Sequence, residues 1–313
     1  MERLVLWYIE KETGHRNLWS TNVYAYRQKR STETALHHAI HHIEKAYNDK
    51  DHVIAAFLDV NGAFNNTNVT ALVNSLKNTG INNGIIRWVE TMLLKRTAIA
   101  TIGESSATKT LTRGTPQGGV LSPVLFNLIM NDLIKEYKRK YPHIKIFNYA
   151  DDLMIIANGR DINTIKLMLE EAIEWMNSWI QTKGLSFSAS KSNIMLLTKR
   201  RKYIKEKPEN DKKDKHGNII IPGNGVKIEG KPVQWVKEAK YLGLWIDDKL
   251  KWKTHCDQTI KKTYNILANC KKVIFKNHGA SPRVIKWMYE QLVRPVLTYA
   301  SLIWIPRLNG TSI

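Results

Sequence analysis

The chain has 313 residues, 43% of them hydrophobic, and carries 48 lysine and arginine residues against 28 aspartate and glutamate residues, a formal net charge of +20. This charge exceeds what solubility requires and favours a polyanionic partner, with nucleic acid as the first candidate. The only cysteines, Cys256 and Cys270, are too few for a disulfide framework or a cysteine-based zinc site. Because neither a signal peptide nor an apolar run of about 18 residues is recognisable, we expect an intracellular protein of the nucleus or cytoplasm, with no membrane partner and no secretion.

The first half of the chain predicts helices interleaved with short strands. Apolar residues at helical spacing, behind a cap at Ser31 or Thr32, predict a helix that reaches about residue 47. The continuous apolar run from Val53 to Val60 indicates a buried strand, followed by a turn at Asn61 and Gly62. Further elements are helices at about 69–79, 85–96 and 123–138, a strand at about 98–102 and a glycine-rich loop at 112–119.

The second half predicts a hairpin at 145–157 and then a long amphipathic helix from about 162 to 180, which ends at Gly184. Residues 199–216 hold nine basic residues against four acids with almost no apolar residue, which is typical of a mobile surface loop. Strands are expected at 193–197, 226–228 and 240–246, and a basic, aromatic helical tail after about residue 250.

Three aspartates are the candidate metal-binding residues. Asp151 and Asp152 lie at the tip of the predicted hairpin, and Asp59 ends the buried strand, so pairing of the strands would gather three carboxylates at one sheet edge. Magnesium prefers such hard oxygen ligands, and the backbone carbonyl of Val60 would complete one coordination sphere. Two such ions activate a primer 3′ oxygen and neutralise phosphate charge. Taken alone, the Asp-Asp pair is equally well explained as a turn-favouring hairpin tip.

An ordered series of motifs resembles the core of reverse transcriptases. Its members are FLDVNGAF at 57–64, GTPQGGVLSP at 114–123, YADD at 149–152, GLSF at 184–187 with Lys191, and YLGL at 241–244. The likeness is closest to polymerases of non-LTR retrotransposons of the LINE-like, jockey type, through residues 26–32 and 295–304. It covers nearly the whole chain.

The resemblance implies catalytic roles for four side chains. Asp59, Asp151 and Asp152 match the metal-binding acids of the family, with two Mg²⁺ ions as cofactors and Mn²⁺ as a possible substitute. Lys191 is similar to a lysine that protonates the leaving pyrophosphate, a general-acid role. As an isolated residue, Lys191 would be read as a solvated surface lysine.

The resemblance also implies binding residues. Phe64 matches an aromatic that would collide with a ribose 2′-hydroxyl, which favours deoxynucleotides, and Gln117 matches a residue that packs against nucleotide and template beside closely approaching glycine backbone. The alternatives are an ordinary core phenylalanine and a buried structural glutamine. The nucleotide site implied is Ala63, Phe64, Gln117 and Gly118, and the primer and template contacts are Tyr149, Arg27, Arg30 and the primer grip at Tyr241, Leu242 and Gly243.

Four histidines on one predicted helix offer a competing interpretation. His37 with His41, and His38 with His42, have the spacing of zinc ligands on a helix, but no third ligand is evident. A solvated helix face is therefore the favoured reading.

The fold implied is α+β, a right-hand polymerase with an antiparallel palm sheet backed by helices. Its expected parts are partial fingers at 1–50, palm at 51–198 with inserted fingers helices, a basic surface loop at 199–217, the palm end and primer grip at 218–250, and a helical thumb at 251–313. We expect a polymerase fragment of a longer element that adds dNTPs to a DNA primer on an RNA template. The alternatives are a relic that binds nucleic acid without efficient synthesis and, less favoured, a group II intron or cellular reverse transcriptase. The sequence defines no oligomeric state.

Overall fold

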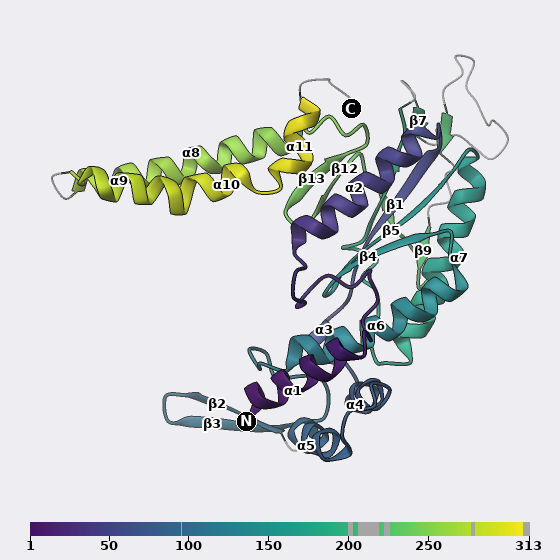
Figure 1. Cartoon of the computed structure of the whole chain (residues 1–313), viewed down its shortest axis with the longest axis vertical. Coiled ribbons are helices and arrows are strands. Elements are labelled where there is room, and N and C mark those ends of the chain that lie inside the picture. Colours follow the sequence, from purple (N-terminus) through teal and green to yellow (C-terminus); the bar gives the residue numbers. More distant parts are fainter. Residues whose placement is uncertain (95, 200–202, 206–218, 222–225, 277–278, 309–313) are drawn as a thin grey trace.

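A five-stranded sheet forms the centre of the protein, seen here in a computed structural model (Figure 1). The structure describes residues 1–94, 96–199, 203–205, 219–221, 226–276 and 279–308. The strand order is β11-β6-β1-β5-β4. The strands are β1 (His52–Asp59), β4 (Lys145–Tyr149), β5 (Asp152–Gly159), β6 (Asn193–Leu197) and β11 (Gln234–Trp235).

Most of this sheet is antiparallel, as expected for a palm, but β11 pairs with β6 in parallel. At this edge the sheet departs from the antiparallel pairing of its other strands. The parallel pair is short, because it joins only Gln234 and Trp235 to Asn193 and Ile194.

Helices cover both faces of the sheet. Alternate residues of β1, such as Ile54 and Ala56, pack on one face against α6 (Ser122–Lys140) and α7 (Ile162–Gln181). Their neighbours, such as Ala55, pack on the other face against α2 (Thr32–Asn48). Burial on both faces explains why β1 is continuously apolar rather than alternating.

A separate apolar cluster forms beside the sheet. It joins the helices of the N-terminal region to the start of α6, and the short helix α3 leads into it from β1. The helices joined are α1 (Glu2–His15), α4 (Val69–Lys77) and α5 (Asn83–Leu94), whereas α3 (Ala63–Asn66) packs against the core of the sheet through Ala63. The helices expected at 69–79 and 85–96 are thus present, each with its end shifted by about two residues.

A hairpin of two strands projects from this region (Figure 1). It consists of β2 (Arg96–Ile102) and β3 (Ser105–Leu111), and nearly all of its residues are exposed. The sequence predicted only the first strand. The second strand escaped prediction because neither face is buried, so no alternation of apolar and polar residues marks it.

The strand expected at 240–246 is a hairpin instead. The chain reverses between β12 (Glu238–Tyr241) and β13 (Leu244–Asp247). The reversal is possible because Leu242 and Gly243 both adopt positive φ angles, of 46° and 83°. A single strand is therefore the wrong assignment for these residues.

The basic segment expected as a surface loop falls largely outside the described residues. Within it, the short strand β7 (Tyr203–Lys205) pairs in parallel with β8 (Ile219–Ile221), which the sequence did not predict. A further two-stranded pair joins β9 (Lys227–Ile228) to β10 (Lys231–Pro232).

The C-terminal region is helical, as expected, and extends away from the sheet (Figure 1). A π-helical turn precedes Pro295, whose missing N–H interrupts the regular helical hydrogen bonds. The elements are α8 (Lys253–Lys276), α9 (Pro282–Met288), η1 (Tyr289–Val293), α10 (Arg294–Thr298) and α11 (Ser301–Leu308). None of the helices in the described ranges combines the length and the apolar character that crossing a bilayer demands.

Candidate functional site

The register of the central sheet brings predicted site residues to one edge. Strands β1 and β5 pair so that Asp59 lies directly opposite Asp152. On its other side, Asp152 lies opposite Tyr149 of β4. Asp151 sits in the turn between β4 and β5, so all three carboxylates belong to the same end of adjacent strands.

The turn that carries Asp151 has an unusual backbone. Ala150 has a φ angle of +57°, a conformation that residues with a Cβ seldom adopt. Asn148 supports it, because its fully buried side chain donates a 2.7 Å hydrogen bond from Nδ2 to the carbonyl of Ala150. The backbone of Asn148 is itself held by Asn22 and Tyr24 on the segment before α2. Sequence analysis missed Asn148, although it directly precedes the Tyr149 motif.

The carboxylates are electrostatically coupled. Burial, followed by the negative charges of Asp151 and Asp59, raises the pKa of Asp152 to about 6. The Oδ2 atom of Asp59 is buried and has no hydrogen-bond partner, while Lys191 places its Nζ 3.6 Å from the same atom. Lys191 is therefore at the carboxylate edge, as the resemblance implied, and in this structure its ammonium neutralises Asp59.

The donor set suits a hard divalent cation. Carboxylate oxygens are the ligands that Mg²⁺ prefers, and the buried Oδ2 of Asp59, which makes no hydrogen bond, could bind such an ion if Lys191 moved away. The side chains do not yet converge. Within the part of the chain that the structure describes, no group of three or more His, Cys, Asp and Glu is arranged to hold a metal ion. That finding includes the histidines of α2, where His38 Nδ1 instead lies 2.8 Å from the Tyr24 hydroxyl.

The residues that follow Asp59 turn towards the glycine-rich loop. Val60 forms a bridge to Phe187, and Ala63 and Phe64 begin α3. The ring of Phe64 is partly buried, with its centroid 5.3 Å from that of Phe126 on α6. Phe64 thus contacts the core and keeps part of its side chain accessible.

The glycine-rich loop folds back onto α3. Only glycine fits at position 114, because a Cβ would lie 2.5 Å from the carbonyl oxygen of Phe64 and the φ angle is +74°. The backbone N–H of Thr115 donates to the same carbonyl at 2.7 Å. Gln117 and Gly118 follow this contact in the chain and are exposed to solvent. The alternative that Gln117 is a buried structural residue is therefore wrong.

The turn at 241–244 is attached to the sheet and to the C-terminal helices. Tyr241 is buried and its hydroxyl donates to the carbonyl of Phe147, one residue before Asn148. The Tyr299 hydroxyl donates to the carbonyl of Leu242 at 2.5 Å. A Cβ on Gly243 would lie 3.2 Å from the Tyr299 ring. Tyr299 was missed because it lies 57 residues from its partner.

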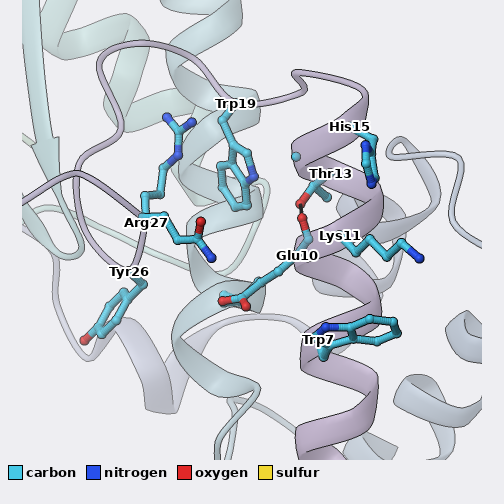
Figure 2. Close-up of a pocket in the computed structure, with 11 residues that line it drawn as sticks. Trp7, Glu10, Lys11, Thr13, His15, Trp19, Tyr26 and Arg27 are labelled. Atoms are coloured by element: carbon cyan, nitrogen blue, oxygen red, sulfur yellow. Dashed lines mark hydrogen bonds between the residues drawn. The ribbon is translucent and has the colours of Figure 1, made fainter.

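The two predicted arginines make contacts within the protein. Arg27 donates to the carbonyls of Ser20 and Val23, at 2.9 and 3.3 Å. Its guanidinium lies 5.5 Å from the ring centroid of Trp19, beside which Figure 2 shows it. Arg30 lies 5.3 Å from the ring centroid of Tyr24. These contacts fix both cations close to the segment that supports Asn148.

Comparison with known proteins agrees with this arrangement. The family model of the reverse transcriptase (RNA-dependent DNA polymerase) matches residues 1–246. The chain is similar to the putative 115 kDa protein in the type-1 retrotransposable element R1DM of Drosophila melanogaster, with 23% identity over 90% of this chain and 25% of the relative. It is also similar to the RNA-directed DNA polymerase from the mobile element jockey of the same organism, with 22% identity over 90% of this chain and 29% of the relative.

A solved structure shares the fold. The apo telomerase of Candida tropicalis, truncated from its C-terminal domain, matches with a TM-score of 0.50 and 13% identity over 78% of this chain and 43% of that chain. The fold is thus the α+β polymerase architecture that the motifs implied.

The chain belongs to the reverse transcriptase family. Its relatives are the polymerases of non-LTR retrotransposons, at low identity, and the chain spans only about a quarter to a third of the length of those described above.

Proposed function

We propose that this chain is an RNA-directed DNA polymerase that joins a dNTP to a primer 3′-hydroxyl on an RNA template. The observation that carries the proposal is the register of β1 and β5, which sets Asp59 opposite Asp152 beside Asp151. Membership of the reverse transcriptase family supports the same reaction. The excess of basic residues suits a nucleic-acid substrate.

Two Mg²⁺ ions, or Mn²⁺ in their place, would be held by Asp59, Asp151 and Asp152, with the carbonyl of Val60 as a further ligand. When bound, such ions activate the attacking hydroxyl and neutralise the phosphates. Binding requires the carboxylates to turn towards one another and Lys191 to leave Asp59. A cation also favours the ionised form of Asp152, whose raised pKa otherwise lets it keep a proton below about pH 6.

Lys191 then becomes available to the substrate. It is 67% exposed and has a flexible side chain, so it can move from Asp59 to the departing pyrophosphate. There its ammonium would donate the proton that the leaving group needs. The lysine thus neutralises the acid site before substrate arrives and the phosphates afterwards.

The sugar would be selected by Phe64. The ring packs against that of Phe126, and Phe64 lies five residues after Asp59, so the core holds the ring in place near the proposed metal site. Gln117 and Gly118 face outward from the loop that contacts Phe64, where they would meet the nucleotide. The turn at Leu242 and Gly243 would hold the primer end.

The test is primer extension by the purified chain on an RNA template with dNTPs and Mg²⁺. We expect extension, and a loss of at least about 100-fold in Asp151→Asn, because removing a metal ligand withdraws several kcal/mol of transition-state stabilisation. Asp49→Asn is the matched control, because Asp49 is an exposed aspartate at the end of α2, away from the sheet edge.

Two results would contradict the proposal. Equal extension by Asp151→Asn and the wild-type chain would show that the carboxylate of Asp151 takes no part in the reaction. Salt-sensitive binding of a template and primer without any extension would favour the relic that binds nucleic acid without efficient synthesis.

A further inference from the structure

A pocket of about 450 Å³ lies between α1 and the segment that follows it (Figure 2). Two of its aromatic side chains are open to solvent, since Trp7 is 60% and Tyr26 51% exposed. Large aromatic side chains around one hollow differ from the scattered exposed apolar residues found on any surface. The lining residues used below are Trp7, Glu10, Lys11, Trp19, Tyr26 and Arg27.

The aromatic side chains of the pocket are accompanied by cations. Lys11 Nζ lies 5.0 Å from the ring centroid of Trp7, and the Arg27 guanidinium lies 5.5 Å from that of Trp19. Aromatic faces beside positive charge are what single-stranded nucleic acids need, because the bases stack and the phosphates are neutralised. Glu10 adds a carboxylate that can accept hydrogen bonds from amino groups of a base.

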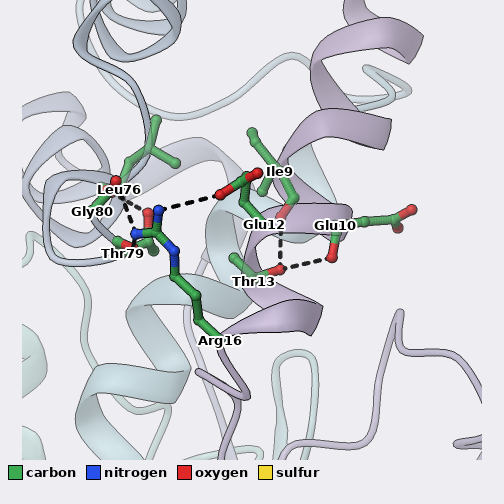
Figure 3. A network of polar contacts seen from close by, with 8 residues as sticks. All are labelled: Ile9, Glu10, Glu12, Thr13, Arg16, Leu76, Thr79 and Gly80. Atoms are coloured by element: carbon green, nitrogen blue, oxygen red, sulfur yellow. Dashed lines mark hydrogen bonds and ion pairs between the residues drawn. The ribbon is translucent and has the colours of Figure 1, made fainter.

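The helix that forms one wall of the pocket is firmly attached. Arg16, at the end of α1, donates from Nη1 to the carbonyls of Thr79 and Gly80 at 3.0 Å, and from Nη2 to Glu12 at 3.2 Å (Figure 3). On the buried side, Val5 and Ile9 pack against α4, α5 and α6. The pocket is therefore formed before any ligand arrives, which lowers the entropic cost of binding.

The opposite wall of the pocket is connected to the carboxylate edge. The N–H of Tyr24 donates to the carbonyl of Asn148, and the N–H of Asn148 donates to the carbonyl of Asn22, each at 3.0 Å. Tyr26, two residues further on, lies close enough to Asp151 and Tyr149 that their charges, after burial, raise its pKa. Tyr26 therefore lies both at the pocket and near the carboxylate edge.

We propose that this pocket binds an unpaired nucleotide of a single-stranded nucleic acid, with its base stacked against Trp7. The identity of that strand as the RNA template rests on the proposed polymerase function. Binding itself requires no synthesis, so the two can be tested separately.

The experiment measures the affinity of the full chain for a fluorescently labelled RNA of about 12 nucleotides, without primer, dNTP or metal. The same RNA with abasic sites, a blunt RNA duplex and a DNA of the same sequence are the comparison ligands. We expect Trp7→Ala to weaken binding of the intact RNA about 10-fold, which is the worth of one stacked base. Trp7→Phe should restore most of it.

The controls separate stacking from loss of structure. Leu4→Ala removes a side chain that is 68% exposed on the same helix and does not line the pocket, and it should leave the affinity unchanged. Gly14→Leu keeps every aromatic side chain but narrows the pocket, since Gly14 lines it and a Cβ there meets nothing within 4 Å. It should weaken single-strand binding as Trp7→Ala does.

The abasic RNA gives the decisive comparison. The wild-type chain should bind it about 10-fold more weakly than the intact RNA, whereas Trp7→Ala should bind both alike. An equal effect of the abasic sites on both proteins would overturn the proposal. It would also be overturned if Trp7→Ala weakened binding of the duplex as much as binding of the single-stranded RNA. The proposal would also be overturned if free nucleoside monophosphate displaced the RNA at concentrations similar to that of the RNA itself. A loss shared by RNA and DNA supports recognition of the base alone, and a loss confined to RNA supports an added contact to the 2′-hydroxyl.

Discussion

Two hairpin turns frame the proposed active site, and they are held in place by different means. The turn at 149–152 joins strands of a five-stranded sheet whose two faces are covered by helices, and Asn148 next to it secures the left-handed Ala150. The turn at 241–244 joins an isolated pair of strands. Its left-handed Leu242 and Gly243 depend on Tyr299, which comes from the C-terminal helices.

Because of this difference, a substitution can affect the turn that carries the carboxylates without affecting the turn that we propose to hold the primer, and the reverse. The carboxylates are fixed by strand register and by a continuous core, so only changes within that core should displace them. The second turn is held to the sheet by the Tyr241 hydroxyl and to the C-terminal helices by the Tyr299 hydroxyl, so a change in those helices reaches it without disturbing the sheet. Substitutions near the first turn should therefore cost more stability than those near the second.

The largest effect on stability is expected from Asn148→Ala. The substitution leaves the buried carbonyl of Ala150 without its donor, which should lower the free energy of unfolding by about 2 kcal/mol. Urea denaturation measures this loss. The matched control is Asn158→Ala on the same hairpin, where a partly buried contact to Asp51 is lost far from the turn. If both variants lose the same stability, the special role of Asn148 in the turn is refuted.

The next effect concerns Gly243→Ala. The added Cβ would meet the Tyr299 ring and would also strain a backbone with a φ angle of +83°, so we expect a loss of about 1 to 2 kcal/mol. Gly230→Ala is the control, because Gly230 has a similar φ angle of +75° but nothing within 4 Å of a Cβ. The difference between the two variants in thermal unfolding measures the cost of the contact between the added Cβ and the Tyr299 ring. Adding Tyr299→Ala should remove the excess loss in Gly243→Ala.

A smaller effect is expected from Tyr299→Phe, which removes only the hydrogen bond to Leu242. Stability should fall by about 1 kcal/mol, and the KM for a primer and template should rise while kcat stays nearly constant, because the turn positions the primer and takes no part in the chemistry. Steady-state primer extension separates the two constants. A fall in kcat at constant KM would show that Tyr299 acts on the reaction itself.

A dependence of stability on pH is also expected in a metal chelator. Because the pKa of Asp152 is about 6 in the folded protein and near 3.8 otherwise, the folded state holds this proton more tightly. The stabilisation is complete below about pH 3.8 and is lost as the pH rises through about 6. Urea midpoints across this range should show a decline that Asp152→Asn lacks. A decline that persists unchanged in this variant would assign it to other groups.

Much of the carboxylate edge could be predicted from the sequence. Asp59 and Asp152 are each next to an apolar run that is buried on both faces, so their places at strand ends follow from local pattern alone. The register that sets them opposite each other does not follow, because it depends on long-range pairing.

The second turn was harder to predict. By their pattern alone, Tyr241 to Leu244 read as part of one strand, and a tight turn there was implied only by the resemblance to a primer grip. The positive φ angles at Leu242 and Gly243 account for the reversal. Those angles are stabilised by a residue far along the chain. The pocket beside α1 posed the same difficulty, since folding alone brings Trp7 and Tyr26 to the same pocket.

The most direct test of the metal site is a switch of metal preference in Asp59→Cys. A thiolate is a poor ligand for Mg²⁺ and a good one for softer cations such as Cd²⁺. Primer extension on an RNA template should therefore be lost by this variant in Mg²⁺ and partly recovered when Mn²⁺ is supplemented with Cd²⁺, which should not help Asp59→Ala. Equal loss in every metal, or no extension by the wild-type chain, would contradict the assignment of Asp59 as a ligand of a catalytic metal ion.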